Sequence, residues 1–126
     1  MERLSDAEIK LMTLLWAHNP IGAKELAQQA SRAIGWNKNT TYTVAGKLVA
    51  KNAVERREPG FVCVAIASKE DVLLCEIDDI IAKLCRGSVR SFFKTLLFAG
   101  RLSWWDLHEL GEMIEAIKSG EADQIP

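Results

Sequence analysis

The chain has 126 residues, of which 48% are hydrophobic and 26% charged, a composition typical of one globular domain with a modest appendage. It lacks an apolar run of about 18 residues and an apolar segment near its start, which excludes a membrane span and a secretory signal. Three cysteines without a Cys-x-x-Cys pair favour free thiols in a reducing compartment. We therefore expect a cytoplasmic protein with no stable membrane association. The net charge of −1 argues at first sight against a nucleic-acid partner.

The charge is unevenly distributed along the chain. Residues 1–68 hold nine Lys and Arg against six Asp and Glu, whereas residues 69–126 hold seven against eleven. Residues 31–57 contain six basic side chains and one acid, Glu55. This asymmetry indicates either a binding face beside a second half with another role, or a basic face that is merely solvated.

The first 68 residues read as three helices followed by a hairpin. Ser-x-x-acid capping boxes, which mark helix starts, occur at Ser5 and Glu8, Ser68 and Asp71, and Ser103 and Asp106. Apolar residues at helical spacing predict a helix from Ser5 to His18, a second over residues 23–33 and a third from Asn37 to about Lys51. Two strands, over residues 54–57 and 61–67, are predicted around the Pro-Gly turn at residues 58–60.

The remaining residues read as three apolar helices. They are expected over residues 68–86, from Val89 to near Gly100, and from Ser103 onward. Three helices in so short a segment have too little surface to bury the apolar face of each helix without a further partner. Either two chains interlock or the helices fold back on the first half; we favour the dimer. The residues expected to form the dimer are Leu73, Ile77, Ile80, Leu84, Phe92, Leu96, Trp104, Leu107, Leu110 and Ile114.

The third helix carries the residues suited to DNA recognition. With Thr41, Val44, Ala45 and Leu48 facing the core, its opposite face is polar and free of acids. A merely solvated helix would be expected to mix Glu with Lys. Asn and Lys can pair with base edges, Thr and Tyr can contact phosphates, and a Thr methyl can touch thymine. In the interpretation that we favour, the exposed face of the helix reads bases, whereas Lys and Arg of the helix and hairpin contact phosphates. Gly46 suits a close approach by another backbone. The expected DNA-binding residues, including two arginines of the hairpin, are Lys38, Asn39, Thr40, Tyr42, Thr43, Gly46, Lys47, Arg56 and Arg57.

Together these elements predict a mostly α fold with a small β-hairpin: a winged helix-turn-helix DNA-binding domain over residues 1–68 and a helical dimerisation region over residues 69–126. The alternative is a winged-helix module that binds a protein instead of DNA. Enzymatic activity is not expected, because no nucleophile, base and orienting group occur together. The scattered histidines and cysteines lack metal-ligand spacing, so neither a metal nor a cofactor is expected.

The sequence resembles the BlaI/MecI (penicillinase repressor) family of winged-helix transcription factors. The segments that carry the resemblance are "LSDAEIKLMTLLW", "AKELAQQ", "GWNKNTTYTVAGKLVAKNAVERRE" and "RGSVRSFF", in that order. The resemblance implies a homodimer that binds a palindromic operator and represses genes for β-lactam resistance or related stress responses. By motif position, it places Asn39, Thr40, Tyr42, Thr43 and Lys47 where the family touches DNA.

The resemblance also implies a way to inactivate the repressor. In the family, a membrane sensor-protease leads to cleavage within the second helix of the dimerisation region, and the matching bond here is Leu97-Phe98. The family residue before Phe is commonly Asn, from which Leu97 departs. The alternative is that both residues belong only to the dimer core.

Overall fold

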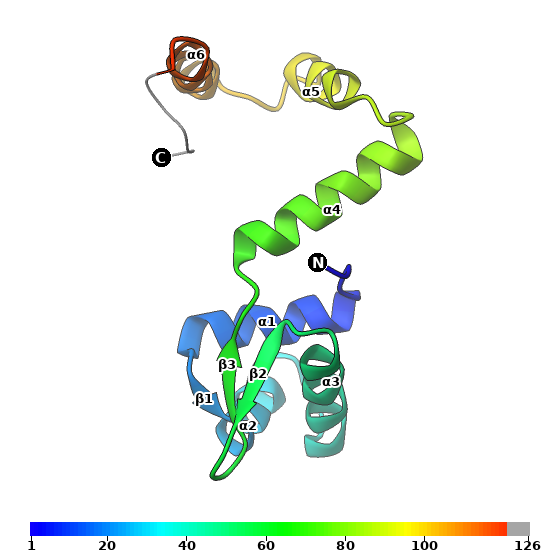
Figure 1. Ribbon diagram of the computed structural model, residues 1–126, viewed down its shortest axis with the longest axis vertical. Helices are drawn as coiled ribbons and strands as arrows, with labels where there is room; N and C mark the ends of the chain where they lie inside the picture. The colour runs from blue at the N-terminus through cyan, green and yellow to red at the C-terminus, as the bar shows by residue number, and fades with distance from the viewer. Residues whose placement is uncertain (121–126) are drawn as a thin grey trace. The chain divides into compact units, whose positions relative to one another are not determined.

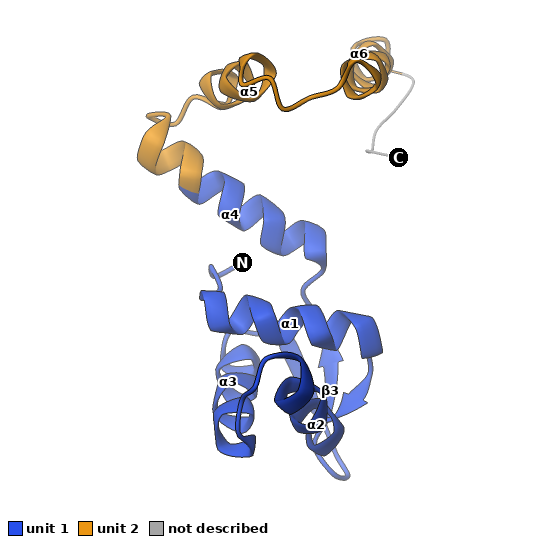
Figure 2. Cartoon of the chain, turned by 180° about the vertical axis from the view of Figure 1, so that it is seen from behind, with its two compact units in different colours: residues 1–79 blue, residues 80–126 orange. Residues whose placement is uncertain are grey.

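The computed structural model describes residues 1–120, which form two units. The first is Met1–Asp79 and the second begins at Ile80 (Figure 2). Helix α4 (Lys69–Leu84) starts in the first unit and ends in the second. The predicted domain limit after residue 68 coincides with the start of α4, whereas the first unit continues through about two-thirds of that helix.

The first unit begins with three helices at the predicted positions (Figure 1). They are α1 (Asp6–His18), α2 (Ala23–Ala33) and α3 (Lys38–Ala50). The predicted capping box of α1 is present, because the Ser5 hydroxyl accepts from the Glu8 backbone N–H and the Glu8 carboxylate accepts from that of Ser5. Asn37 caps α3 by accepting from the backbone N–H of Thr40.

A three-stranded antiparallel sheet follows, in the order β1-β3-β2. Strands β2 (Val54–Arg57) and β3 (Val62–Ala65) form the predicted hairpin, which projects beside α2 and α3 as a wing (Figure 1). The second strand is shorter than predicted, because Phe61 adopts a left-handed φ of 50° and belongs to the turn. Strand β1 (Ile21–Gly22) was not predicted, since two residues are too few to show a period.

The core of the first unit is built from α1, α2, α3 and the sheet. Leu11, Leu15, Leu26 and Leu48 are fully buried, as are the side chains that the helical period placed inward on α3. Cys63 is buried in the sheet as a free thiol, and its burial raises the pKa of the thiol. The amphipathic pattern therefore predicted the core of this unit.

One ion pair of the first unit combines a buried carboxylate with a half-buried ammonium. The Lys51 ammonium lies 2.7 Å from Oε1 of Glu8, a side chain that is 2% exposed, and it also donates to the backbone carbonyl of Arg3. Burial raises the pKa of Glu8, but hydrogen bonds from Lys51 and Ser5 outweigh this and hold the pKa below its ordinary value. The pair joins the start of α1 to the end of α3.

The second unit has almost no core of its own. Helices α5 (Val89–Phe98) and α6 (Trp104–Lys118) contain no buried residue. Among the described residues from Ile80 to Gly120, Ile81 is the one large apolar residue whose side chain is buried. Trp104, one of the residues expected to form the dimer, and its neighbour Trp105 are 65% and 70% exposed in the single chain.

None of the helices within residues 1–120 combines the length and the apolar character needed to cross a membrane.

The buried ion pair predicts the effect of Lys51→Met. This variant leaves the Glu8 carboxylate buried without its cation, so we expect the free energy of unfolding at pH 7 to fall by about 2 kcal/mol. Because the folded-state pKa of Glu8 is lowered, its stabilising contribution is present above the unfolded pKa of about 4.3 and is lost as the pH falls further. The difference between wild type and variant should therefore shrink below about pH 4.5.

Urea unfolding from pH 3.5 to 7 measures this difference. Lys10→Met, which removes an exposed lysine from α1, is the matched control and should leave stability nearly unchanged. A loss for Lys51→Met that equals the loss of the control, or that stays constant across this range, would contradict the assignment.

Candidate nucleic-acid interface

The polar face of α3 is open to solvent. Helices α2 and α3 pack against each other as a helix-turn-helix, and Gly35 lies in the turn between them with a φ of 79°. The face away from the core carries seven exposed residues: Lys38, Asn39, Thr40, Thr43, Gly46, Lys47 and Ala50. A side chain added at Gly46 would meet no described atom within 4 Å, so the close approach suggested by this glycine does not come from the described part of the chain.

Tyr42 is less open than the sequence predicted, because it joins the helix to the wing. Its ring lies 6.3 Å from that of Phe61, at an angle of 54°. The Lys38 ammonium lies 5.7 Å from the centre of the Tyr42 ring, and the Arg56 guanidinium lies 4.0 Å from that of Phe61. Two cations thus flank a pair of aromatic rings that bridges α3 and the hairpin.

The role of Phe61 was not predicted from the sequence. The available signal was an aromatic residue directly after the Pro-Gly turn, but its partner Tyr42 lies 19 positions away in another element. Local patterns do not identify such contacts.

The two wing arginines have acidic partners that the charge count did not reveal. Nε of Arg56 lies 2.6 Å from a Glu58 carboxylate oxygen, and Nη2 of Arg57 lies 3.3 Å from one of Glu55. The hydrogen bonds from Arg56 and from the backbone N–H of Phe61 lower the pKa of Glu58, so this carboxylate remains charged at neutral pH. All four charged side chains are exposed, and exposed pairs of this kind are weak. Either arginine can exchange its carboxylate for another anion.

The residues expected to form a dimer lie on α4, α5 and α6. Eight of the ten are exposed large apolar side chains: Leu73, Ile80, Leu84, Leu96, Trp104, Leu107, Leu110 and Ile114. Ile77 and Phe92 are half-buried. Leu97 and Phe98, the predicted cleavage position, form the last turn of α5 and are 48% and 83% exposed.

The chain was then compared with known proteins. The family model of the penicillinase repressor matches residues 4–116. The chain belongs to the penicillinase repressor family. A curated relative, the penicillinase repressor of Bacillus licheniformis, is 24% identical over 119 residues, which cover 93% of each chain. Membership makes this protein a transcriptional repressor with a DNA-binding winged helix, and not an enzyme.

Two solved structures of the repressor BlaI resemble the N-terminal half. One is its DNA-binding domain, at 28% identity and a TM-score of 0.50, covering 54% of this chain and 85% of that one. The other is Bacillus licheniformis BlaI in its monomeric form in complex with the blaP half-operator, also at 28% identity and a TM-score of 0.50. This match covers 56% of this chain and 88% of that one. The predicted fold class, a winged helix-turn-helix followed by further helices, is confirmed.

Proposed function

We propose that this repressor is a homodimer that binds a palindromic operator and controls genes for β-lactam resistance or related stress responses. Residues 1–68 would bind DNA and residues 69–126 would hold the dimer together. One observation carries the proposal: the exposed face of α3 bears two lysines and no acid, and it lies beside a wing with two arginines. The other observations concern the roles of individual residues.

In this proposal α3 is the recognition helix. Asn39 and Thr43 lie on its exposed face and would read base edges in the major groove. Lys47 and the wing arginines would contact phosphates, which position the protein and make its affinity depend on salt. The open space around Gly46 would let the DNA backbone approach α3 closely. The solved complex of BlaI with a half-operator supports, by similarity, DNA binding by the winged helix.

The roles of Lys47 and Thr43 can be tested with DNA selected by the protein itself from a pool of random duplexes. The selected sequence should be an inverted repeat. Lys47→Ala should weaken binding to selected and random duplexes alike and, with two copies per dimer, lower the slope of log affinity against log salt by about two. Thr43→Ala should instead relax discrimination between the selected and random sequences. Fluorescence anisotropy at several salt concentrations measures both effects.

Lys10→Ala is the control for charge, because Lys10 is exposed on α1 and lies outside the proposed interface. The absence of binding at low salt would contradict the proposal and favour a protein-binding role for the winged helix. Variants at Lys47 and Thr43 that bind like Lys10→Ala would contradict the assignment of α3.

Dimerisation is proposed because the second unit exposes apolar surface that needs a partner. Leu107, Leu110, Ile114 and Ile117 follow helical spacing along α6 and are each 40% to 55% exposed. Full burial of one such side chain contributes about 1.5–3 kcal/mol. These side chains are about half exposed in the single chain, so covering one of them contributes about half of that value, and a symmetric pair of chains covers the same set on both copies.

Leu110→Glu should disrupt this dimer. Two buried leucines are lost and two carboxylates must be desolvated, so we expect dimerisation to weaken at least about a hundredfold. Binding to a full palindrome should then fall to the affinity for a single half-site. Ser91→Glu is the matched control: it adds the same charge at an exposed position three residues after Ser88, where a carboxylate favours the helix start. A Leu110→Glu variant that still binds the palindrome like wild type would contradict the role of α6.

We also propose that cleavage of the Leu97-Phe98 bond, after activation of a membrane sensor-protease, inactivates the repressor. Both side chains are exposed in the single chain. The bond lies in the last turn of α5, where the final carbonyls lack partners within the helix, so local opening is easier there than in mid-helix. Cleavage would separate α6 from the rest of the chain and remove its dimer contacts.

Co-expression with a membrane sensor-protease of a β-lactam response tests this step. After exposure to a β-lactam, mass spectrometry should detect fragments that end at Leu97 and begin at Phe98. The penicillinase repressor of Bacillus licheniformis serves as a comparison substrate. If that protein is cut while this chain remains intact, the proposed cleavage is wrong.

A further inference from the structure

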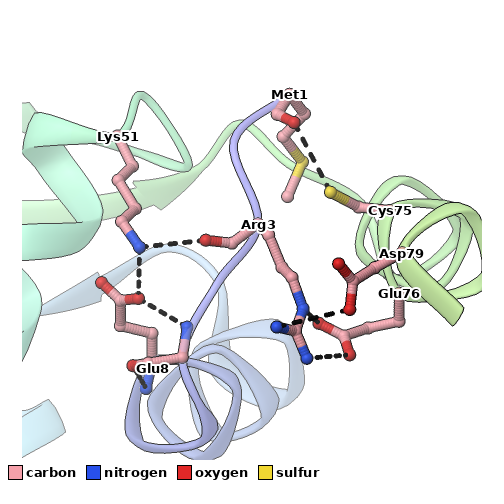
Figure 3. A network of polar contacts seen from close by, with 8 residues as sticks. Met1, Arg3, Glu8, Lys51, Cys75, Glu76 and Asp79 are labelled. Atoms are coloured by element: carbon pink, nitrogen blue, oxygen red, sulfur yellow. Dashed lines mark hydrogen bonds and ion pairs between the residues drawn. The ribbon is translucent and has the colours of Figure 1, made fainter. Parts of the chain in front are cut away.

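The five residues before α1 contact both α3 and α4 within the first unit (Figure 3). Leu4 is 3% exposed and belongs to the core, which anchors the segment. The Met1 carbonyl accepts a hydrogen bond from Sγ of Cys75 on α4, at 3.5 Å. This N-terminal segment is therefore held in place and does not behave as a free end.

Arg3 provides the main contact with α4. Its Nε and Nη2 atoms lie 3.1 Å and 3.3 Å from the two carboxylate oxygens of Glu76, and its Nη1 lies 3.5 Å from Oδ2 of Asp79. Glu76 and Asp79 are three residues apart and share one face of α4. The hydrogen bond to Glu76 and the charges of both carboxylates raise the pKa of Arg3. This geometry uses the planar fork of a guanidinium, which a lysine lacks.

The backbone of the same residue is bonded to the end of α3. The Arg3 carbonyl accepts a hydrogen bond of 3.0 Å from Nζ of Lys51, the residue that caps α3. The Lys51 ammonium is itself fixed by the buried Glu8 carboxylate at 2.7 Å. A continuous set of polar contacts thus leads from the end of α3, through Arg3, to the third turn of α4.

Helix α4 has a second attachment at its start. Nε1 of Trp16 donates to the Ala67 carbonyl at 2.8 Å, just before the Ser68 cap, and Val72 is buried in the core. Glu76 lies eight residues after Ser68, or about 12 Å along a helix. One attachment would leave α4 free to pivot, whereas two attachments this far apart fix its direction relative to α3.

We infer that Arg3 is a positioning residue that sets the direction of α4 relative to the recognition helix, and thereby the spacing and rotation of the two recognition helices in the dimer. The inference rests on the proposed function, since it needs a dimer that binds two half-sites. Exposed ion pairs contribute little to folding. Arg3 therefore acts on the alignment of two half-sites and leaves contacts within one half-site unchanged.

The test compares three duplexes: the palindrome selected by the wild-type protein, one half-site of it, and the palindrome with one inserted base pair. The insertion rotates one half-site by about 35° relative to the other. Arg3→Gln and Glu76→Gln should each lower affinity for the palindrome about three- to tenfold and leave half-site affinity within about twofold. Both variants should also lose less affinity on insertion of the base pair than wild type does.

Matched controls separate alignment from charge. Lys10→Gln on α1 and Asp78→Asn on α4 remove the same charges at exposed positions and should match wild type on all three duplexes. The exchange Arg3→Glu with Glu76→Arg should restore part of the affinity for the palindrome and of the sensitivity to the insertion, since Asp79 still faces position 3. A direct contact between Arg3 and DNA would give no such recovery. Thermal unfolding by circular dichroism verifies that each variant is folded.

The inference would be wrong, while the proposed function stands, if Arg3→Gln and Glu76→Gln lost as much affinity for the half-site as for the palindrome. It would also be wrong if Arg3→Gln bound the palindrome and tolerated the inserted base pair as wild type does. A wild-type protein that binds the palindrome no more tightly than the half-site would instead overturn the proposed dimer, and the inference with it.

Discussion

The organisation of this repressor depends on apolar surface that one chain does not bury. Between Ile80 and Gly120 the helices carry leucine, isoleucine, phenylalanine and tryptophan side chains, yet Ile81 is the one large apolar side chain of this described segment that is buried. Exposed apolar surface on this scale marks an interaction site. In the proposed dimer, the cost of leaving that surface in water becomes the free energy that joins two DNA-binding units.

The first unit, by contrast, holds the polar face of α3 in a fixed direction. Its core follows the amphipathic stripes of α1, α2 and α3. Glu8 neutralises Lys51 at the end of α3, whereas Glu55 and Glu58 neutralise the wing arginines only at the exposed surface. The carboxylate of the Glu8–Lys51 pair is buried, whereas both wing pairs are exposed and therefore weak. Burial thus separates a charge that holds the fold from the exposed charges that we propose contact DNA.

Local signals in the sequence predicted most of the elements. Ser5, Ser68 and Ser103 each accept from a backbone N–H three residues later, as the predicted capping boxes require. These features depend on neighbours within one helical turn, so a single sequence is enough to predict them.

Contacts between distant residues were not predicted. Arg3 and Glu76 are 73 positions apart, and Glu8 and Lys51 are 43 apart. Composition and periodicity say nothing about which surface charges meet once the helices pack. The helical period correctly predicted an exposed face without acids on α3, but it did not predict the aromatic bridge between Tyr42 and Phe61.

The mass of the wild-type protein in solution, measured by sedimentation equilibrium without DNA at micromolar concentration, tests the central claim most directly. We expect twice the mass of one chain, because in the proposed dimer a second copy covers the apolar faces of the second unit. A mass equal to that of one chain would contradict the proposed dimer, if it is measured at protein concentrations that fully bind the operator when DNA is added.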